Sequence, residues 1–101
     1  MKMLTIICRE QFEDEVLVLF DRLAVTGYTV VHKVGGSGET GAVSVTHTSS
    51  GGNKLFLVAL PDDRMAALVQ AVKELQARLV SESEGHPVPF KAFLLPCEPI
   101  V

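Results

Sequence analysis

The sequence lacks the features that would place a chain in or across a membrane. Its longest apolar runs cover only a few residues, whereas a transmembrane helix needs roughly 20. The N-terminus also has no basic region followed by an apolar stretch and a cleavage site, which a secretory signal would show. We therefore expect a cytoplasmic protein that reaches a membrane only if a partner recruits it.

An excess of positive charge is absent as well. Nine Lys and Arg residues stand against 12 Asp and Glu residues, so the net charge is −3 and the pI is about 5.5. Such a chain exerts no broad attraction on phosphate backbones or anionic lipids. We therefore expect no nucleic-acid partner.

Cysteine and histidine are too scattered to indicate a metal site or catalysis. Cys8 and Cys97 form neither a metal-binding spacing nor a C-x-x-C redox pair, and we expect both to be buried or half-buried apolar side chains. His32, His47 and His86 match no tight metal-ligand spacing. No serine or cysteine nucleophile lies in a recognisable pattern with a base. We expect no bound metal and no enzymatic activity.

The sequence does contain enough apolar residues, in a periodic order, to build one core. Its 101 residues, 48% of them apolar and 21% charged, predict a single globular domain over 1–101. Apolar runs of strand length alternate with segments whose apolar residues recur every three or four positions. The predicted strands cover 3–8, 28–34, 54–60 and 90–95, and the predicted helices cover 10–23 and 62–80.

Local signals mark the ends of these elements. Gly27 lies just beyond the first helix, where glycine commonly ends a helix. Pro61 should stop the third strand, and Asp62 and Asp63 should supply the N-cap of the second helix. The near-continuous hydrophobicity of 54–60 predicts a strand covered on both faces, hence central in its sheet or buried in an assembly.

The βαββαβ order predicts an α+β fold of the ferredoxin-like class, an antiparallel four-stranded sheet with two helices on one face. The first strand should lie between the third and the fourth. Cys8 and Cys97 would then lie about 20 Å apart, which is too far for a disulfide within one chain. An RNA-recognition module shares this strand order, but it needs aromatic side chains on its central strands, and 54–60 offers only Phe56.

The uncovered face of this sheet should carry many apolar side chains, because three of its four strands are apolar on both faces. Exposure of that face to water would leave a large apolar patch. We therefore expect a homo-oligomer that covers it.

The glycines concentrate in one segment. Six of the eight lie between Gly35 and Gly52, directly after the β-branched run that ends at Val34. We expect 35–41 to be a loop that can take positive φ, and 42–48 to be a short exposed strand. A polar connection of this length in a compact domain usually carries function, although a plain hairpin tip is the alternative.

Three segments resemble the PII signal-transduction proteins, and the divergent PII-like members in particular. Residues 26–30 with Gly35 and Gly41 are similar to the second strand of that family and the entry to its mobile T-loop. Residues 60–63 resemble its junction of third strand and second helix, and 91–98 resemble its fourth strand. Because these segments follow in the family's order, the resemblance spans essentially the whole chain.

The resemblance implies a function in signal transduction, such as nitrogen regulation. It implies a homotrimer whose clefts between subunits bind an adenine nucleotide (ATP, ADP or AMP). A T-loop at about 35–53 would dock onto a target protein such as a membrane transporter. The residues matched to ligand-binding positions or to the phosphate-facing glycine segment are Ile7, Thr29, Gly35, Gly36, Ser37, Gly38, Glu39, Leu60, Gly85 and Lys91.

The chain departs from the family around this site. In 84–91 only Gly85 and Lys91 match the phosphate-binding loop, while two prolines remove backbone donors and Glu84 adds a carboxylate. Glu39 replaces a glutamine that helps to hold magnesium and 2-oxoglutarate. We therefore expect the nucleotide to bind weakly or in an altered mode. The alternative role of Lys91 is that of an exposed lysine that protects a sheet edge.

Two other families share this fold and remain alternatives. A CutA-like protein would also be a trimer and would bind a metal or confer metal tolerance. An ACT-like module would bind a small molecule and form a dimer. The measured mass separates the dimer from the trimer, and a thermal melt with zinc or copper tests metal binding.

Overall fold

The computed structural model describes residues 1–38, 41–43 and 52–101 of the chain, and for residues 38 and 41–43 it describes the backbone alone. The elements follow in the order β1 (Lys2–Arg9), a 3-10 helix (Glu10–Phe12), α1 (Glu13–Arg22), β2 (Thr29–Val34), β3 (Gly36–Gly38), β4 (Gly41–Val43), β5 (Asn53–Leu60), α2 (Asp62–Glu82) and β6 (Phe90–Pro96). The predicted order of four main strands and two helices is confirmed.

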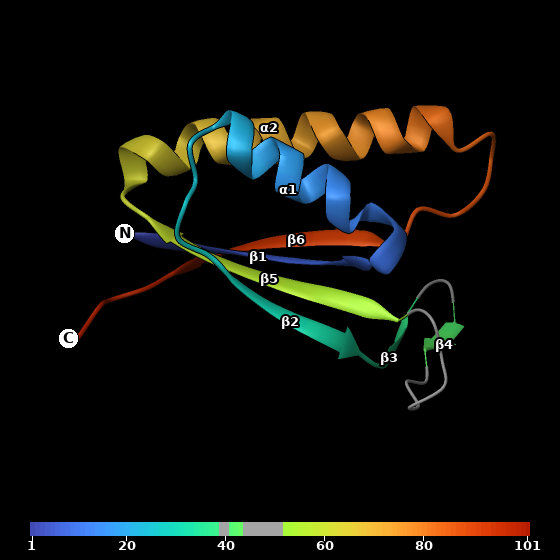
Figure 1. Cartoon of the computed structure of the whole chain (residues 1–101), viewed down its shortest axis with the longest axis horizontal. Helices are drawn as coiled ribbons and strands as arrows, with labels where there is room; N and C mark the ends of the chain where they lie inside the picture. The colour runs from blue at the N-terminus through green and yellow to red at the C-terminus, as the bar shows by residue number, and fades with distance from the viewer. Residues whose placement is uncertain (39–40, 44–51) are drawn as a thin grey trace.

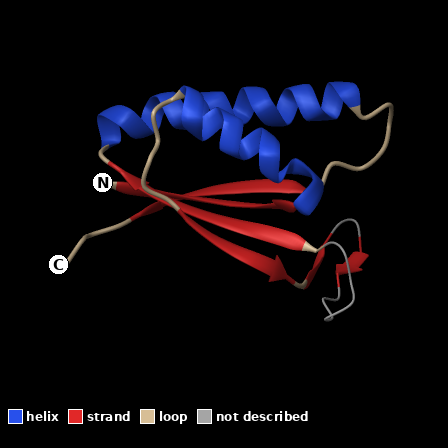
Figure 2. Ribbon diagram, in the orientation of Figure 1, coloured by secondary structure: helices blue, strands red, loops and turns tan. Residues whose placement is uncertain are grey.

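The four long strands form one sheet, in the order β2-β5-β1-β6, and every neighbouring pair is antiparallel. Strand β1 therefore lies between β5 and β6, as predicted. Both helices cover the same face of this sheet, and no described helix or strand covers the opposite face (Figure 1). This is the ferredoxin-like α+β arrangement. The short strands β3 and β4 form a separate two-stranded sheet among the described residues, at one end of the main sheet (Figure 2).

The core lies between the helices and the sheet. Alternate residues of β1 and β5 point into it, and Ile6, Phe56 and Val58 are fully buried. Phe20 of α1 packs edge-on against Phe56 with ring centroids 5.8 Å apart, a preferred aromatic geometry. Each such buried side chain contributes roughly 1.5–3 kcal/mol through removal of apolar surface from water. This layer holds the subunit together.

The opposite face of the sheet is also apolar. In the strand register, Leu57 of β5 pairs with Thr5 of β1, and Thr5 pairs with Phe93 of β6, so these three side chains point to the same side. Phe93 is 53% exposed although it is a large aromatic residue. We call this surface the open face, and its apolar residues are Met3, Ile7, Val31, Leu55, Leu57, Ala59, Phe93 and Leu95. The predicted uncovered apolar face is present.

A residue other than the predicted Gly27 terminates helix α1. The amide of Val25 donates to the carbonyl of Phe20 over 2.8 Å, and that of Ala24 donates to Asp21 over 3.1 Å. These two bonds form a Schellman motif, in which the residue after the C-cap takes a left-handed conformation. That residue is Ala24, with φ of 57°. Gly27 lies outside the motif because the helix stops at Arg22, earlier than the apolar periodicity indicated.

The start of α2 also differs from the prediction. Pro61 occupies the N-cap position, without a side-chain cap, and Asp62 and Asp63 already lie in the first helical turn. There the carboxylates stabilise the helix through the positive end of its dipole instead of as caps. The first predicted helix likewise begins as a 3-10 turn over Glu10–Phe12 before α1 starts.

The glycine-rich segment differs from a simple loop where the structure describes it. Ser37 pairs with Ala42 and Gly38 with Gly41, so 36–38 is a strand that opens a small hairpin. The left-handed residue at its entrance is Lys33, with φ of 58°, and among the described glycines only Gly52 and Gly85 have positive φ. The predicted strand over 42–48 is described only as far as Val43, and the rest lies outside the described residues.

The two cysteines are unbonded and lie at opposite ends of the sheet. Cys8 pairs with Phe90 at the start of β6, whereas Cys97 follows the end of that strand, where its amide donates to Met1. The predicted separation of the two thiols is confirmed.

Candidate functional site

Three strands and one loop meet at the end of the sheet from which the glycine-rich segment leaves. Val34 of β2 pairs with Asn53 of β5, and Asn53 pairs with Arg9 of β1. The Arg9 amide donates to the carbonyl of Pro89, in the loop before β6, over 3.3 Å. The departure and return of residues 35–52 are therefore fixed to the same end of the sheet as the loop that contains Gly85. We call this region the glycine end.

The structure brings several predicted ligand-binding residues together at the glycine end. Ile7 lies directly between Leu55 and Lys91 on the open face. Ile7 is half-buried and Lys91 is exposed. Gly35 and Gly36 follow β2 at this end, and Gly36 has no atom near the position that a Cβ would occupy. Apolar surface thus lies beside a cation and glycine backbone, which together suit an aromatic ligand that carries an anion.

Other predicted residues lie away from that group. Thr29 pairs with Leu57 and lies halfway along the open face. Leu60 pairs with Lys2 at the opposite end of the sheet, points to the helix side and is only 7% exposed. Leu60 lies five positions along β5 from Leu55, the partner of Ile7, a distance of about 16 Å. One subunit therefore does not bring all of these residues to a single cavity.

The remaining predicted positions lie in loops. Gly85 has φ of 86° and open space beside it, in the loop that precedes β6. Its neighbour Glu84 also adopts positive φ, 53°, although it carries a side chain. Ser37 and Gly38 lie in β3, away from the main sheet. Glu39 lies outside the described residues.

A partly buried polar cluster on the helix side of the glycine end was missed in the sequence. Lys54 is 7% exposed in the core-facing register of β5, and its ammonium group donates to Nδ1 of His32 on β2. The Glu13 carboxylate of α1 lies 3.7 Å from both groups. The signal was the position of Lys54, because alternation from Phe56 and Val58 places it on the buried face. We call Glu13, His32 and Lys54 the latch cluster.

The thiol of Cys8 lies beside this cluster, since Cys8 pairs with Lys54 across the sheet. Burial raises its pKa from the ordinary 9.0 to about 12, and the nearby Glu13 carboxylate adds to the shift. Cys8 is therefore a neutral, unreactive thiol at physiological pH. This agrees with its prediction as a core residue.

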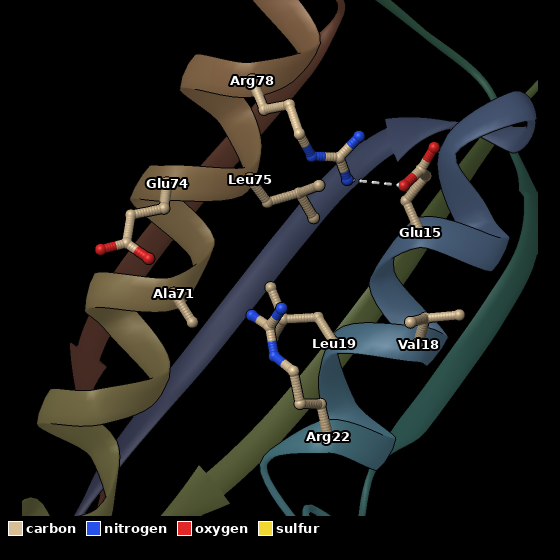
Figure 3. Close-up of a pocket in the computed structure, with 8 residues that line it drawn as sticks. All are labelled: Glu15, Val18, Leu19, Arg22, Ala71, Glu74, Leu75 and Arg78. Atoms are coloured by element: carbon tan, nitrogen blue, oxygen red, sulfur yellow. Dashed lines mark hydrogen bonds and ion pairs between the residues drawn. The ribbon is translucent and has the colours of Figure 1, made fainter.

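A shallow groove of about 240 Å³ lies between the two helices on the outer side (Figure 3). Arg78 of α2 bridges the groove at one end by a 2.7 Å ion pair with Glu15 of α1. Arg22 projects into it from α1 over the apolar floor (Figure 3). The exposed charges of the groove partly neutralise one another, so it has no clear preference for an anion or a cation.

Within the described residues, no three His, Cys, Asp or Glu side chains are grouped as metal ligands would be. His47 lies outside the described residues. No described helix combines the length and apolar character that crossing a bilayer requires.

Comparison with known proteins identifies the family. The family model described as nitrogen regulatory protein P-II matches residues 1–98, which is nearly the whole chain. The chain belongs to the P-II family. This result confirms the resemblance drawn from the sequence and favours it over the CutA-like and ACT-like alternatives. Members of this family are regulatory proteins. A search of curated proteins gives no significant match.

Solved structures of PII-like proteins have the same fold. CPII from Thiomonas intermedia K12, bound to ADP, AMP and bicarbonate, is 21% identical with a TM-score of 0.66, and the match covers 93% of this chain and 84% of that one. A second structure of that complex is 22% identical with a TM-score of 0.57, and the match covers 93% of this chain and 90% of that one. A structure of CPII from the same organism bound to ADP and bicarbonate is 21% identical with a TM-score of 0.65, and the match covers 93% of this chain and 84% of that one.

Proposed function

We propose that this P-II family member is a homotrimeric regulator that binds an adenine nucleotide in clefts between its subunits. The observation that carries the proposal is the open face. It is a largely apolar surface whose glycine end carries Ile7 and Lys91. Packing of three copies through this face would remove the apolar surface from water and create clefts at its borders.

The division of the matched residues supports a site between subunits. Ile7 and Lys91 lie at the glycine end, whereas Thr29 lies halfway along the open face. Leu60 is buried on the helix side and lies outside this proposed cleft. A cleft shared by two copies can combine the glycine end of one with the middle of the sheet of the other. In this arrangement Lys91 contacts phosphate, and Ile7 contacts the base or ribose.

The nucleotide should bind weakly or in an altered mode. Pro87 and Pro89 have no amide hydrogens, so the loop before β6 offers fewer donors for phosphate. Glu84 adds a negative charge beside Gly85, which opposes an anion. ADP or AMP, which PII-like CPII holds together with bicarbonate, are therefore the first ligands to test.

The signal would pass through the segment at about 35–53, which leaves and re-enters the sheet at the glycine end. A ligand beside Gly35 and Lys91 can contact this segment differently in its alternative conformations, and so shift their populations. The segment would then present a different surface to a target protein, such as a membrane transporter to which this cytoplasmic regulator docks.

Isothermal titration with ADP, AMP and ATP, each with and without bicarbonate, tests the proposal. We expect Lys91→Ala to weaken the binding of the preferred nucleotide about tenfold or more, the value of one charge-assisted hydrogen bond. Lys73→Ala, on the exposed side of α2, is the matched control and should bind like the wild type. Nucleotide affinity that survives Lys91→Ala would contradict the site, and no heat with any nucleotide would contradict the function.

A further inference from the structure

The latch cluster holds the end of β2 from which the glycine-rich segment leaves. Val31 pairs with Leu55, but the register shifts before Val34 pairs with Asn53, and Lys33 takes a left-handed conformation inside this irregularity. Regular backbone pairing is therefore interrupted around His32. The side-chain contacts of His32 with Lys54 and Glu13 bridge this gap.

The hydrogen bond between Lys54 and His32 requires a neutral imidazole. A lysine ammonium group has only donors, so Nδ1 of His32 must accept, with its ring proton on Nε2. A protonated imidazole has two donors and no acceptor, so protonation removes this bond. It also places a second cation beside the lysine, with one carboxylate, Glu13, shared between them.

The two cations differ in their freedom to move apart. The Lys54 side chain is 9% exposed, and the strand and helix around it hold it in place, whereas the His32 side chain is 59% exposed. Cys8, which pairs with Lys54 from the neighbouring strand β1, stays neutral at physiological pH because burial raises its pKa to about 12. Among the described residues, the charged groups that contact His32 are Glu13 from α1 and Lys54 from β5. Protonation should move His32 outward, and Lys54 should keep Glu13.

We propose that the latch cluster is a pH-sensitive switch, in which protonation of His32 releases the end of β2 and changes the backbone conformation of residues 34–36, where the glycine-rich segment begins. Histidine is the side chain that ordinarily changes charge between about pH 5 and 8. Since the segment is the surface through which the regulator would act, this inference rests on the proposed function. It adds acidification as a second input, which acts from the helix side of the sheet.

Amide resonances of Val34, Gly35 and Gly36 in the full chain, followed by nitrogen-15 NMR from pH 8 to pH 5.5 without nucleotide, test the switch. We expect these resonances to shift together with the ring signals of His32. His32→Asn keeps an acceptor near the position of Nδ1 but does not titrate, so the shift should be lost. His86→Asn, in the loop before β6, is the matched control and should titrate like the wild type.

Lys54→Met separates the switch from a general effect of acid. Methionine preserves the apolar stem in the buried position but cannot donate to His32. In this variant the amides of Val34, Gly35 and Gly36 should no longer respond to pH. Equal pH responses in the wild type and His32→Asn would overturn the switch. That result would leave the proposed function standing, because nucleotide binding and trimer mass are measured separately at pH 8.

Discussion

The two faces of one sheet carry the same kind of side chains in opposite surroundings. On the helix side, Ile6, Phe56 and Val58 are fully buried within the subunit. On the open face, Leu57 is half-buried by its neighbours alone, and Phe93 and Leu95 are 53% and 49% exposed. A sheet face that is exposed to water usually carries polar side chains. The helix side is the core of the single chain, and in the proposed trimer the open face would be the core of the assembly.

Exchange of Phe56 for alanine should break the first core. Phe56 is 0% exposed and contacts Phe20, so its removal should cost about 3–5 kcal/mol in the free energy of unfolding. Urea denaturation followed by circular dichroism measures this loss. The adjacent Leu57→Ala is the matched control, because it points to the open face and should lower association more than folding. Equal losses of folding stability in the two variants would contradict the separation of the two cores.

Exchange of Leu57 for aspartate should break the second core alone. A buried, unpaired carboxylate in an interface costs several kcal/mol, whereas an isolated subunit can leave it in water. We expect the mass from light scattering to fall to that of one chain while the far-ultraviolet circular dichroism keeps its helical signal. Val18→Asp is the control, because Val18 is 66% exposed on the outer side of α1. A Leu57→Asp variant with the wild-type mass would show that this face is not an interface.

Alkaline pH should weaken the helix-side core through Cys8. Its folded pKa of about 12 lies above the ordinary 9.0, so the stability from the neutral thiol is complete below pH 9 and is lost between 9 and 12. In that window the free energy of unfolding should fall by up to about 1.4 kcal/mol per pH unit more than in Cys8→Ala. Denaturation midpoints of both proteins from pH 8 to 11 measure this difference, and identical slopes would contradict the burial of the thiol.

Replacement of Ala24 by glycine should stabilise the folded chain and leave the open face unaffected. Ala24 holds the left-handed position after α1, where an alanine is strained by roughly 1 kcal/mol and a glycine is not. The free energy of unfolding should rise by about that amount, while the number of subunits stays the same. Ala67→Gly, in the exposed middle of α2, should lower it by about as much. A loss of stability in both variants would argue against the cap.

Long-range periodicity made most of the fold predictable. The strand at 54–60 is apolar at nearly every position, and this indicated correctly that it is central. The helix termini were less predictable, because the apolar stripe of α1 continues past the point where its backbone turns. Phe20 and Val25 close that end through a motif with alanine in the glycine position, which composition alone does not reveal.

The candidate site was predictable only in part. Ile7 and Lys91 become neighbours through strand register, which the predicted topology implied. The grouping of Lys54, His32 and Glu13 depends on the pairing of β2 with β5 and on where α1 begins, and neither follows from sequence spacing. The proposed cleft between subunits is harder still to predict, since its second wall would belong to another copy of the chain.

The mass of the wild-type protein by light scattering at micromolar concentration tests the central claim most directly, namely that the open face is the core of an assembly. The account predicts three times the chain mass of 10.9 kDa. A particle with the mass of a single chain would contradict it, because the apolar surface around Leu57 and Phe93 would then face water and no cleft between subunits could exist.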